Sequence, residues 1–178
     1  MSTMQIAAQM VNGVGTIFNM AGINFKKKSN VLIAFTLGNA CVATALGMLG
    51  AVSGMITQII FVIETIINYF YEKKKGANVK YPIWMIVIYV LVPTIIVAMF
   101  FGSLWDLLPM TAGILFPLAL ISKELALRLL NLLSVALWIP YNFVFGQYVG
   151  AISCIIFTIV NFIAIVRLDI FKINANKE

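Results

Sequence analysis

The feature that most constrains this chain is a series of long apolar segments. Hydrophobic residues make up 62% of its 178 residues and charged residues only 10%, whereas water-soluble domains are about half apolar and about a quarter charged. A helix needs about 20 apolar residues to cross a bilayer, and short polar or basic stretches divide the chain into segments of about this length. We expect each segment to cross the membrane once. The segments are 4–24, 30–48, 51–71, 81–101, 108–122, 128–145 and 148–167.

The positions of the basic residues test this number of crossings independently. If the chain crosses seven times, the stretches near 25–29, 72–80 and 122–128 and the C-terminal tail lie on one side of the membrane. All 12 lysine and arginine residues fall on this side, whereas a wrong number of crossings would scatter them over both. Because cytoplasmic loops carry the excess of Lys and Arg, we expect the N-terminus outside and the C-terminus in the cytoplasm.

Two similar helix starts indicate an internal repeat. The sequences GAVSGMITQIIF at 50–61 and GQYVGAISCIIF at 146–157 align without a gap at an offset of 96 residues. The same offset pairs the second expected helix with the sixth, and an offset of 98 pairs the first with the fifth. We therefore predict an all-α integral membrane protein with two parallel triple-helix units, 1–72 and 105–178. The basic loop and a linker transmembrane helix at 73–104 join them.

Glycines and prolines inside these segments carry two further predictions. The GxxxG spacings at 50–54 and 146–150 let helix backbones approach closely, so we expect tight packing within each unit. Pro117 and Pro140 lie within the first two segments of the second unit. A proline has no backbone donor and leaves a carbonyl free one turn earlier, so both positions are predicted hinges.

Polar and aromatic side chains recur at helical spacing in several segments. In the sixth, Asn131, Ser134, Trp138 and Tyr141 are spaced along one stripe, with Asn142 beside the last. Amides both donate and accept hydrogen bonds, and aromatic rings offer stacking faces. This combination suits a neutral polar solute such as a sugar, nucleoside or vitamin, although hydrogen bonding between helices is the alternative interpretation. The candidates on other helices are Asn12, Asn19, Gln58 and Asn161.

Glu64 is the only acidic residue well inside an apolar segment, and Asn68 follows one helical turn later. A charge at the centre of a membrane helix costs about 2.5–3.5 kcal/mol on insertion scales. One interpretation is a group that couples transport to a proton or another cation, with Asn68 beside it. The other is a partly solvated carboxylate that is paired with Asn68 or with a nearby lysine.

The order and spacing of the segments resemble the superfamily that holds the SWEET sugar carriers, the PQ-loop carriers and the PnuC vitamin transporters. Within it, the chain is similar to the YgjV family of small bacterial inner-membrane proteins. The similarity is carried by KKKSNVLIAFTLGNACVATALGMLGAVSGMI at 26–56 and by RLLNLLSVALWIPYNFVFGQYVGAISCIIFTIVNFIAIVR at 128–167. It implies a multi-pass protein of the bacterial cytoplasmic membrane with SWEET-like architecture, and it implies no substrate. The chain departs from those related carriers in one respect, because neither unit contains a Pro-Gln dipeptide.

These observations separate the classes of function. A transporter that works by facilitated diffusion and alternating access accounts for the repeat, the hinge prolines and the polar stripes, and a non-transporting membrane scaffold is the alternative. The chain has no histidine and its acidic residues are isolated, so we expect no enzyme, no metal site and no cofactor. Its basic residues stand in short clusters between apolar segments, which argues against nucleic acid. The expected partners are the lipid bilayer and a small-molecule solute, and a homo-oligomer is compatible with this sequence.

Overall fold

Every regular element in the computed structural model, which describes residues 3–76 and 81–170, is helical. Its seven α-helices occupy the seven predicted segments and end within four residues of the predicted bounds, which confirms the helical fold class. A 3₁₀ turn, η1 (Leu104–Asp106), precedes α5, and a π-helical turn, η2 (Val166–Ile170), follows α7. The α-helices are α1 (Thr3–Ile23), α2 (Lys28–Met48), α3 (Val52–Lys75), α4 (Ile83–Met99), α5 (Leu107–Leu120), α6 (Glu124–Val144) and α7 (Tyr148–Ile165).

Four of these helices are long and apolar enough to cross a membrane by length and composition alone. They are α2, α3, α6 and α7. Helix α1 has 21 residues, but its amides and hydroxyl groups lower its hydropathy, and α4 and α5 are apolar but have only 17 and 14 residues. The structure therefore supports a helical membrane protein, and the number of seven crossings stays a prediction.

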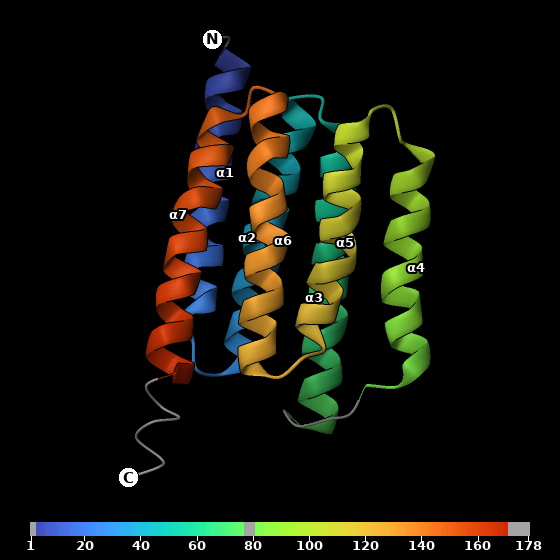
Figure 1. Ribbon diagram of the computed structural model, residues 1–178, viewed down its shortest axis with the longest axis vertical. Coiled ribbons are helices and arrows are strands. Elements are labelled where there is room, and N and C mark those ends of the chain that lie inside the picture. Colours follow the sequence, from blue (N-terminus) through green and yellow to red (C-terminus); the bar gives the residue numbers. More distant parts are fainter. Residues whose placement is uncertain (1–2, 77–80, 171–178) are drawn as a thin grey trace.

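The helices form two layers with an extra helix at one edge (Figure 1). Helices α1, α2 and α3 pack side by side in one layer, and α5, α6 and α7 do so in the other. The layers meet where α1 packs against α7 and where α3 packs against α5. Six helices therefore surround the interior, and α4 lies outside this ring, against α5 and a smaller part of α3.

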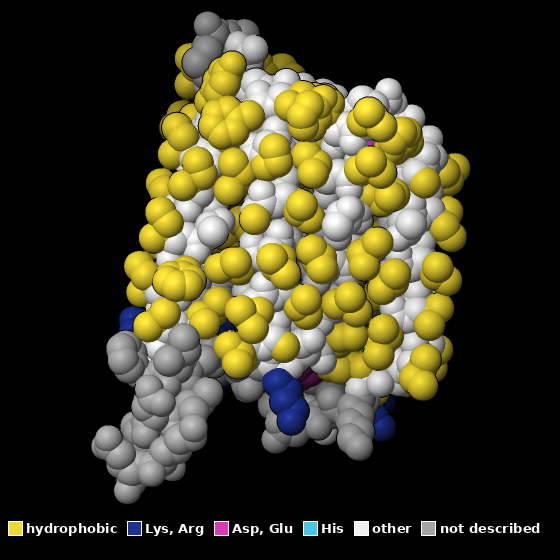
Figure 2. Space-filling model, viewed as in Figure 1, with side chains coloured by type: hydrophobic (Ala, Val, Ile, Leu, Met, Phe, Trp, Pro, Cys, Tyr) yellow, Lys and Arg dark blue, Asp and Glu magenta, His cyan; other side chains and the backbone are white. Residues whose placement is uncertain are grey.

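The outer surface of the molecule is apolar except at its ends. Figure 2 shows hydrophobic side chains over most of one face, with Lys and Arg only near its lower end. The exposed apolar side chains include Ile17, Phe70, Ile159 and Phe162. Contiguous apolar surface of this extent is not found on soluble monomers, and hydrocarbon is the environment that it fits.

The basic residues of the described chain gather at one end. They lie at the turn between α1 and α2, at the end of α3, at the start of α6 and just after α7. Lys80, Lys172 and Lys177, which the sequence predicts on the same side, lie outside the described residues. The molecule therefore has one basic end, as positive-inside topology requires.

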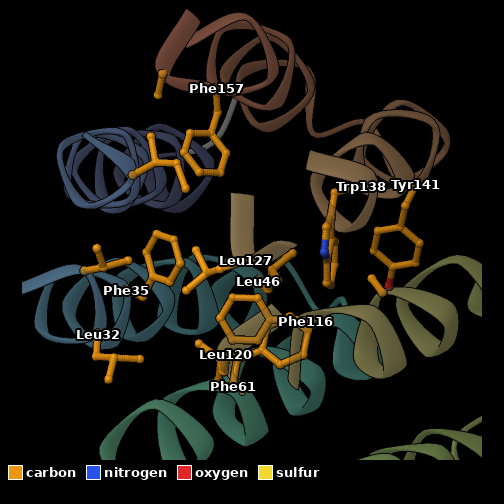
Figure 3. Close-up of a cluster of buried hydrophobic side chains, with 14 of the residues drawn as sticks. Leu32, Phe35, Leu46, Phe61, Phe116, Leu120, Leu127, Trp138, Tyr141 and Phe157 are labelled. Atoms are coloured by element: carbon orange, nitrogen blue, oxygen red, sulfur yellow. The ribbon is translucent and has the colours of Figure 1, made fainter. Parts of the chain in front are cut away.

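Aromatic rings fill part of the space between the layers. The ring of Phe116 on α5 lies 4.1 Å from that of Phe61 on α3 and 5.9 Å from that of Phe35 on α2, centroid to centroid. Figure 3 shows these three rings together, with Trp138 projecting from α6 toward the same interior. The contacts join residues that are far apart in the sequence, so they hold the two layers against each other.

The glycines of the two GxxxG spacings have different roles from those predicted. Gly50 and Gly146 have φ of +74° and +68° and form the tight turns before α3 and α7, where only glycine is free of strain. The second glycines make the close contacts. A Cβ atom on Gly54 would lie 3.2 Å from the Tyr141 ring, and one on Gly150 would lie 2.9 Å from Nδ2 of Asn12. Gly54 and Gly150 therefore pack closely, but these shortest contacts join the two predicted units rather than helices within one unit. The prediction of close packing is wrong for the turn glycines.

The closest helix contact in the first layer is between α1 and α2. A Cβ atom on Gly15 would lie 2.7 Å from the carbonyl oxygen of Gly38 and 2.9 Å from Cβ of Cys41. A backbone oxygen cannot move away without displacing its helix. Gly13, half a turn earlier on α1, has open space around its Cα, and it offers a matched control.

We predict that Gly15→Ala lowers the free energy of unfolding by about 1–3 kcal/mol, because the added methyl group overpacks the α1–α2 contact. Gly13→Ala should leave the stability unchanged or raise it by up to about 1 kcal/mol through helix propensity. Unfolding of the purified protein in detergent, followed by circular dichroism, measures both. Equal stabilities of the two variants would contradict this account of the contact.

Candidate functional site

A cavity lies between the two layers and is lined by all six helices of the ring. The space inside it that the centre of a water molecule can reach is about 70 Å³. One water needs about 10–15 Å³ on this measure. The cavity is therefore large enough for several waters or for part of a small polar molecule.

The polar lining of the cavity consists mainly of amides. Hydroxyl groups of Thr16, Ser134 and Ser153 add to them, and no Asp, Glu, Lys or Arg of the described chain lines the cavity. Such a lining can donate and accept hydrogen bonds without favouring either sign of charge. The amide residues are Asn12, Asn19, Asn39, Gln58, Asn131, Asn142 and Gln147.

Five of these amides have a buried polar atom with no hydrogen-bond partner among the residues that the structure describes. The atoms are Oδ1 of Asn19, Nδ2 of Asn39, Oε1 of Gln58, Nδ2 of Asn131 and Nε2 of Gln147. Leaving a buried polar group unpaired costs about 1–3 kcal/mol, and folded proteins rarely keep several such groups in one place. Five in one cavity, with donors and acceptors together, therefore indicate a site for water or a polar solute.

Aromatic side chains form the rest of the wall. Trp138 lines the cavity with Phe35, Phe61, Phe116 and Phe157, and its buried ring stands edge-on to Tyr141, with centroids 5.5 Å apart. Figure 3 shows the indole ring edge-on, with Tyr141 on one side of it and the interior on the other. Flat faces of this kind can stack on a sugar ring or a heterocycle.

The structure brings together seven of the nine residues that the sequence predicts for solute binding. Those that line the cavity are Trp138, Asn142, Asn131, Ser134, Asn12, Asn19 and Gln58. Gly38 leaves room for one of them, because a Cβ atom there would lie 2.1 Å from Oδ1 of Asn19. The hydroxyl of Ser134 donates to the carbonyl of Ala112 at 3.3 Å, which holds α6 against α5 at the cavity wall.

The other two predicted residues, Tyr141 and Asn161, do not line the cavity. Asn161 is fully buried near the basic end, where its Nδ2 donates to the carbonyl oxygen of Arg128 at 3.1 Å. Tyr141 faces α3, and its hydroxyl lies 2.8 Å from Oγ of Ser53. Both residues connect helices, which is the alternative that the sequence left open for polar side chains.

The Tyr141 contact belongs to a polar network at the end opposite the basic one. Ser53 donates to Oδ1 of Asp106 at 2.9 Å, so its oxygen accepts from Tyr141. The other carboxylate oxygen of Asp106 accepts from the backbone N–H groups of Gly102 and Ser103, both at 2.9 Å. Burial alone would raise the pKa of Asp106, but these hydrogen bonds outweigh it and hold the pKa below its usual value.

Two of the lining amides, Asn39 and Gln147, were not predicted from the sequence. Asn39 is a single amide in the apolar segment 30–48, and it accepts from Nδ2 of Asn19 at 3.4 Å. Gln147 stands in the turn before α7 and is 2% exposed. The repeat offset gave no signal for either residue, because it pairs Asn39 with Val135 and Gln147 with Ala51.

The predicted hinge prolines both lie within helices that continue past them. Pro117 is inside α5, next to the lining residue Phe116, and Pro140 is inside α6, between Trp138 and Asn142. Each removes one backbone hydrogen bond from its helix. Their positions beside the cavity agree with a hinge, and bending at them stays a prediction.

Glu64 and Asn68 are buried on α3 but do not line the cavity. Oε2 of Glu64 and both side-chain polar atoms of Asn68 have no hydrogen-bond partner in the described chain. The lysine that does bind a carboxylate on α3, Lys28, pairs with Glu72 at 2.7 Å. The interpretation of Glu64 as a paired carboxylate therefore finds no partner among the described residues.

A ring of helices around a polar interior, four of them long and apolar enough to cross a membrane, defines the class of this molecule, a multi-pass helical membrane protein. A family model described as bacterial inner membrane protein, Imp-YgjV, matches residues 6–171, and the chain belongs to this family. The resemblance to the YgjV family is thereby confirmed, and so is a location in the bacterial inner membrane. No curated protein and no solved structure matches the chain.

The Asp106 network predicts a specific pH dependence of stability. A carboxylate whose pKa is lower in the folded than in the unfolded chain stabilises the fold above the unfolded pKa of about 3.9. That contribution is lost as the pH falls through the folded pKa. Asp106→Asn should therefore show a smaller loss of melting temperature than the natural protein between about pH 5 and pH 3, in detergent.

Ser53→Ala is the control for this measurement, because it removes one hydrogen bond and keeps the carboxylate. Its pH dependence should lie between those of the natural protein and Asp106→Asn. If Asp106→Asn loses stability with falling pH as steeply as the natural protein does, the network does not hold Asp106 ionised.

Proposed function

We propose that this inner-membrane protein is a facilitated transporter for a small, neutral, polar solute such as a sugar, nucleoside or vitamin. The observation that carries the proposal is the uncharged, amide-rich cavity enclosed by the two helical layers. Transport rather than catalysis fits this site, because its lining offers hydrogen bonds and stacking faces but no charged acid or base.

The two layers are the predicted parallel triple-helix units, 1–72 and 105–178, with 73–104 as the linker. The cavity lining supports this assignment. Each residue of α2 that lines the cavity has a counterpart on α6, 96 positions later, that lines it too. On α3 and α7, two further pairs keep the same offset. The pairs are Phe35 and Asn131, Asn39 and Val135, Val42 and Trp138, Leu46 and Asn142, Gln58 and Cys154, and Phe61 and Phe157.

These pairs give the cavity a nearly symmetric shape but an asymmetric chemistry. Where one unit has a polar or indole side chain, as at Asn39 or Trp138, the other has an aliphatic one, Val135 or Val42. A site of this kind would bind an asymmetric solute in one orientation. Its place between parallel repeats is also the plan by which transporters of this type form their sites, and the proposal extends to membership of the SWEET, PQ-loop and PnuC superfamily.

Hydrogen bonds join the two units at both ends of the molecule in this conformation. At the basic end, Nζ of Lys28 donates to the carbonyl of Ser122 at 3.1 Å, and Arg167 donates to Oδ1 of Asn24 at 2.9 Å. At the other end, Tyr141 is bonded to Ser53. Alternating access would break these two sets of contacts in turn, with Pro117 and Pro140 as the bending points.

A transporter of this kind also has a defined orientation in the membrane and a defined set of partners. The basic end faces the cytoplasm, so the N-terminus lies outside and the C-terminus inside, in agreement with the positive-inside rule. The apolar outer face contacts lipid, the cavity takes the solute, and the exposed face of α4 leaves room for a homo-oligomer. No part of this function requires a cofactor, a metal or nucleic acid.

The test begins with a ligand screen on the purified protein. Its melting temperature is measured with sugars, nucleosides and vitamins, and uptake of any compound that raises it is then followed in proteoliposomes. Trp138→Ala should weaken binding of that compound about tenfold or more, because the stacking face is lost. Trp138→Phe keeps an aromatic ring but loses the indole donor, so its affinity for the compound should lie between those of Trp138→Ala and the natural protein.

Trp84→Ala is the matched control, because Trp84 on α4 is 62% exposed and far from the lining. It should bind and transport as the natural protein does. Normal binding by folded Trp138→Ala would remove this residue from the solute path. If no compound raises the melting temperature, the membrane scaffold is the better description of the protein.

A further inference from the structure

Polar residues, four of them buried and one half-buried, face each other between α3 and α4, outside the solute cavity. On α3 they are Glu64, Asn68 and Glu72, which recur every four residues and so share one face of the helix. On the other side stand Tyr81, just before α4, and Tyr89 within it. We call these five residues the α3–α4 polar row.

The register of the two antiparallel segments places these residues opposite each other. Tyr81 donates its hydroxyl hydrogen to Oε1 of Glu72, which fixes the alignment at the basic end. Glu64 lies eight residues before Glu72 on α3, and Tyr89 lies eight residues after Tyr81 on the antiparallel segment, so Glu64 and Tyr89 are opposite each other. The phenol of Tyr89 lies within electrostatic range of the Glu64 carboxylate. Asn68 lies between the two pairs.

The end of the row that lies at the basic end of the molecule is well paired. Glu72 is 5% exposed, accepts from Tyr81 and forms an ion pair with Lys28 at 2.7 Å. The ammonium of Lys28 also lies 5.4 Å from the centroid of the Tyr81 ring. Because Lys73 and its neighbours follow directly at the exposed end of α3, this end of the row is the one nearest to water.

The part of the row farther from the basic end is buried, and its polar atoms have no hydrogen-bond partners among the described residues. Glu64 is 3% exposed, and its Oε2, both polar atoms of the Asn68 side chain and the hydroxyl of Tyr89 have no partner among the described residues. No Lys or Arg of the described chain pairs with Glu64. Of the helices that pack against α3, α5 contains no titratable residue, α4 contains Tyr89, and α2 contains Lys28, which pairs with Glu72, and Cys41. About 12 Å of helix separate Glu64 from Glu72, at 1.5 Å per residue.

A buried carboxylate without a cationic neighbour is costly in a membrane, and a bound cation would remove that cost. The groups around Glu64 suit both of its protonation states, because the amide of Asn68 and the hydroxyl of Tyr89 can each donate to a carboxylate or accept from a carboxylic acid. Calcium and magnesium ions take six or more oxygen ligands, and no metal-binding group of His, Cys, Asp and Glu exists in the described residues. A proton requires only one oxygen.

We propose that Glu64 is a reversible proton-binding site, which protons reach from the basic end of the molecule along the α3–α4 polar row. On binding, one proton leaves the water at that end and converts the Glu64 carboxylate into a neutral carboxylic acid. On release, the same proton returns to water and the negative charge is restored. The site does not line the solute cavity, so this proposal does not rest on the proposed transport function.

Infrared difference spectroscopy of the protein in lipid nanodiscs tests the proposal without a solute. As the pH is lowered, the natural protein should gain a C=O band of a buried carboxylic acid, and Glu64→Gln should lack that band. Asn68→Leu should shift the band because the acid loses a hydrogen-bond partner. Glu72→Gln is the matched control on the same helix face, and it should keep the band.

Three results would overturn the proposal. One is the same pH-dependent band in Glu64→Gln as in the natural protein, or no band at any pH. Another is loss of the band in Glu72→Gln instead. The third is removal of the band when NaCl replaces KCl at constant pH, which would make this a sodium site. If Glu64→Gln does not fold, Glu64→Asp decides, because the band should then shift in frequency rather than stay unchanged.

Discussion

A polar side chain inside a bilayer has no water to bind, so it must lie on the inside of the protein and find its partners there. This constraint accounts for most of the arrangement of the chain. Its outer surface is apolar, while Asn12, Asn131 and Gln147 point between two layers of helices. The amides are too many to pair with one another across such a small space. What results is a cavity that keeps unpaired donors and acceptors together.

Helical periodicity and charge were enough to predict the helices, the basic end and most of the polar residues that line the cavity. They failed where a small angular difference decides which neighbour a side chain meets. Relative to Asn131, Asn142 lies about 20° around α6 but Tyr141 about 80° in the other sense, at 100° per residue. Asn142 therefore faces the cavity, and Tyr141 faces Ser53 on α3. Asn39 was missed for another reason, since a single amide in an apolar segment has no stripe to reveal it.

The contacts within a layer differ from those between the layers. Helices of one layer are held by close backbone packing, whereas the ends of the two layers are joined by hydrogen bonds. Gly15 brings α1 against the backbone of α2, so this pair is suited to move as one body. Between the layers, by contrast, single hydrogen bonds such as that from Lys28 to Ser122 join the ends of the two units. A hydrogen bond from a charged group contributes about 1.5–3 kcal/mol, which a bound solute can offset. The α3–α4 polar row lies outside this ring, so the two proposed sites share only α3.

Cysteine labelling tests most directly whether water and solute reach the cavity between the layers. In a background with Cys41 and Cys154 replaced by Ala, Ser134→Cys lies in the cavity wall and Leu133→Cys, its neighbour, faces lipid with 52% exposure. A water-soluble thiol reagent, applied to right-side-out and to inverted membrane vesicles, should modify Ser134→Cys and leave Leu133→Cys unmodified. If both cysteines react at the same rate, or if Ser134→Cys is inert from both sides, no solute path passes between the layers.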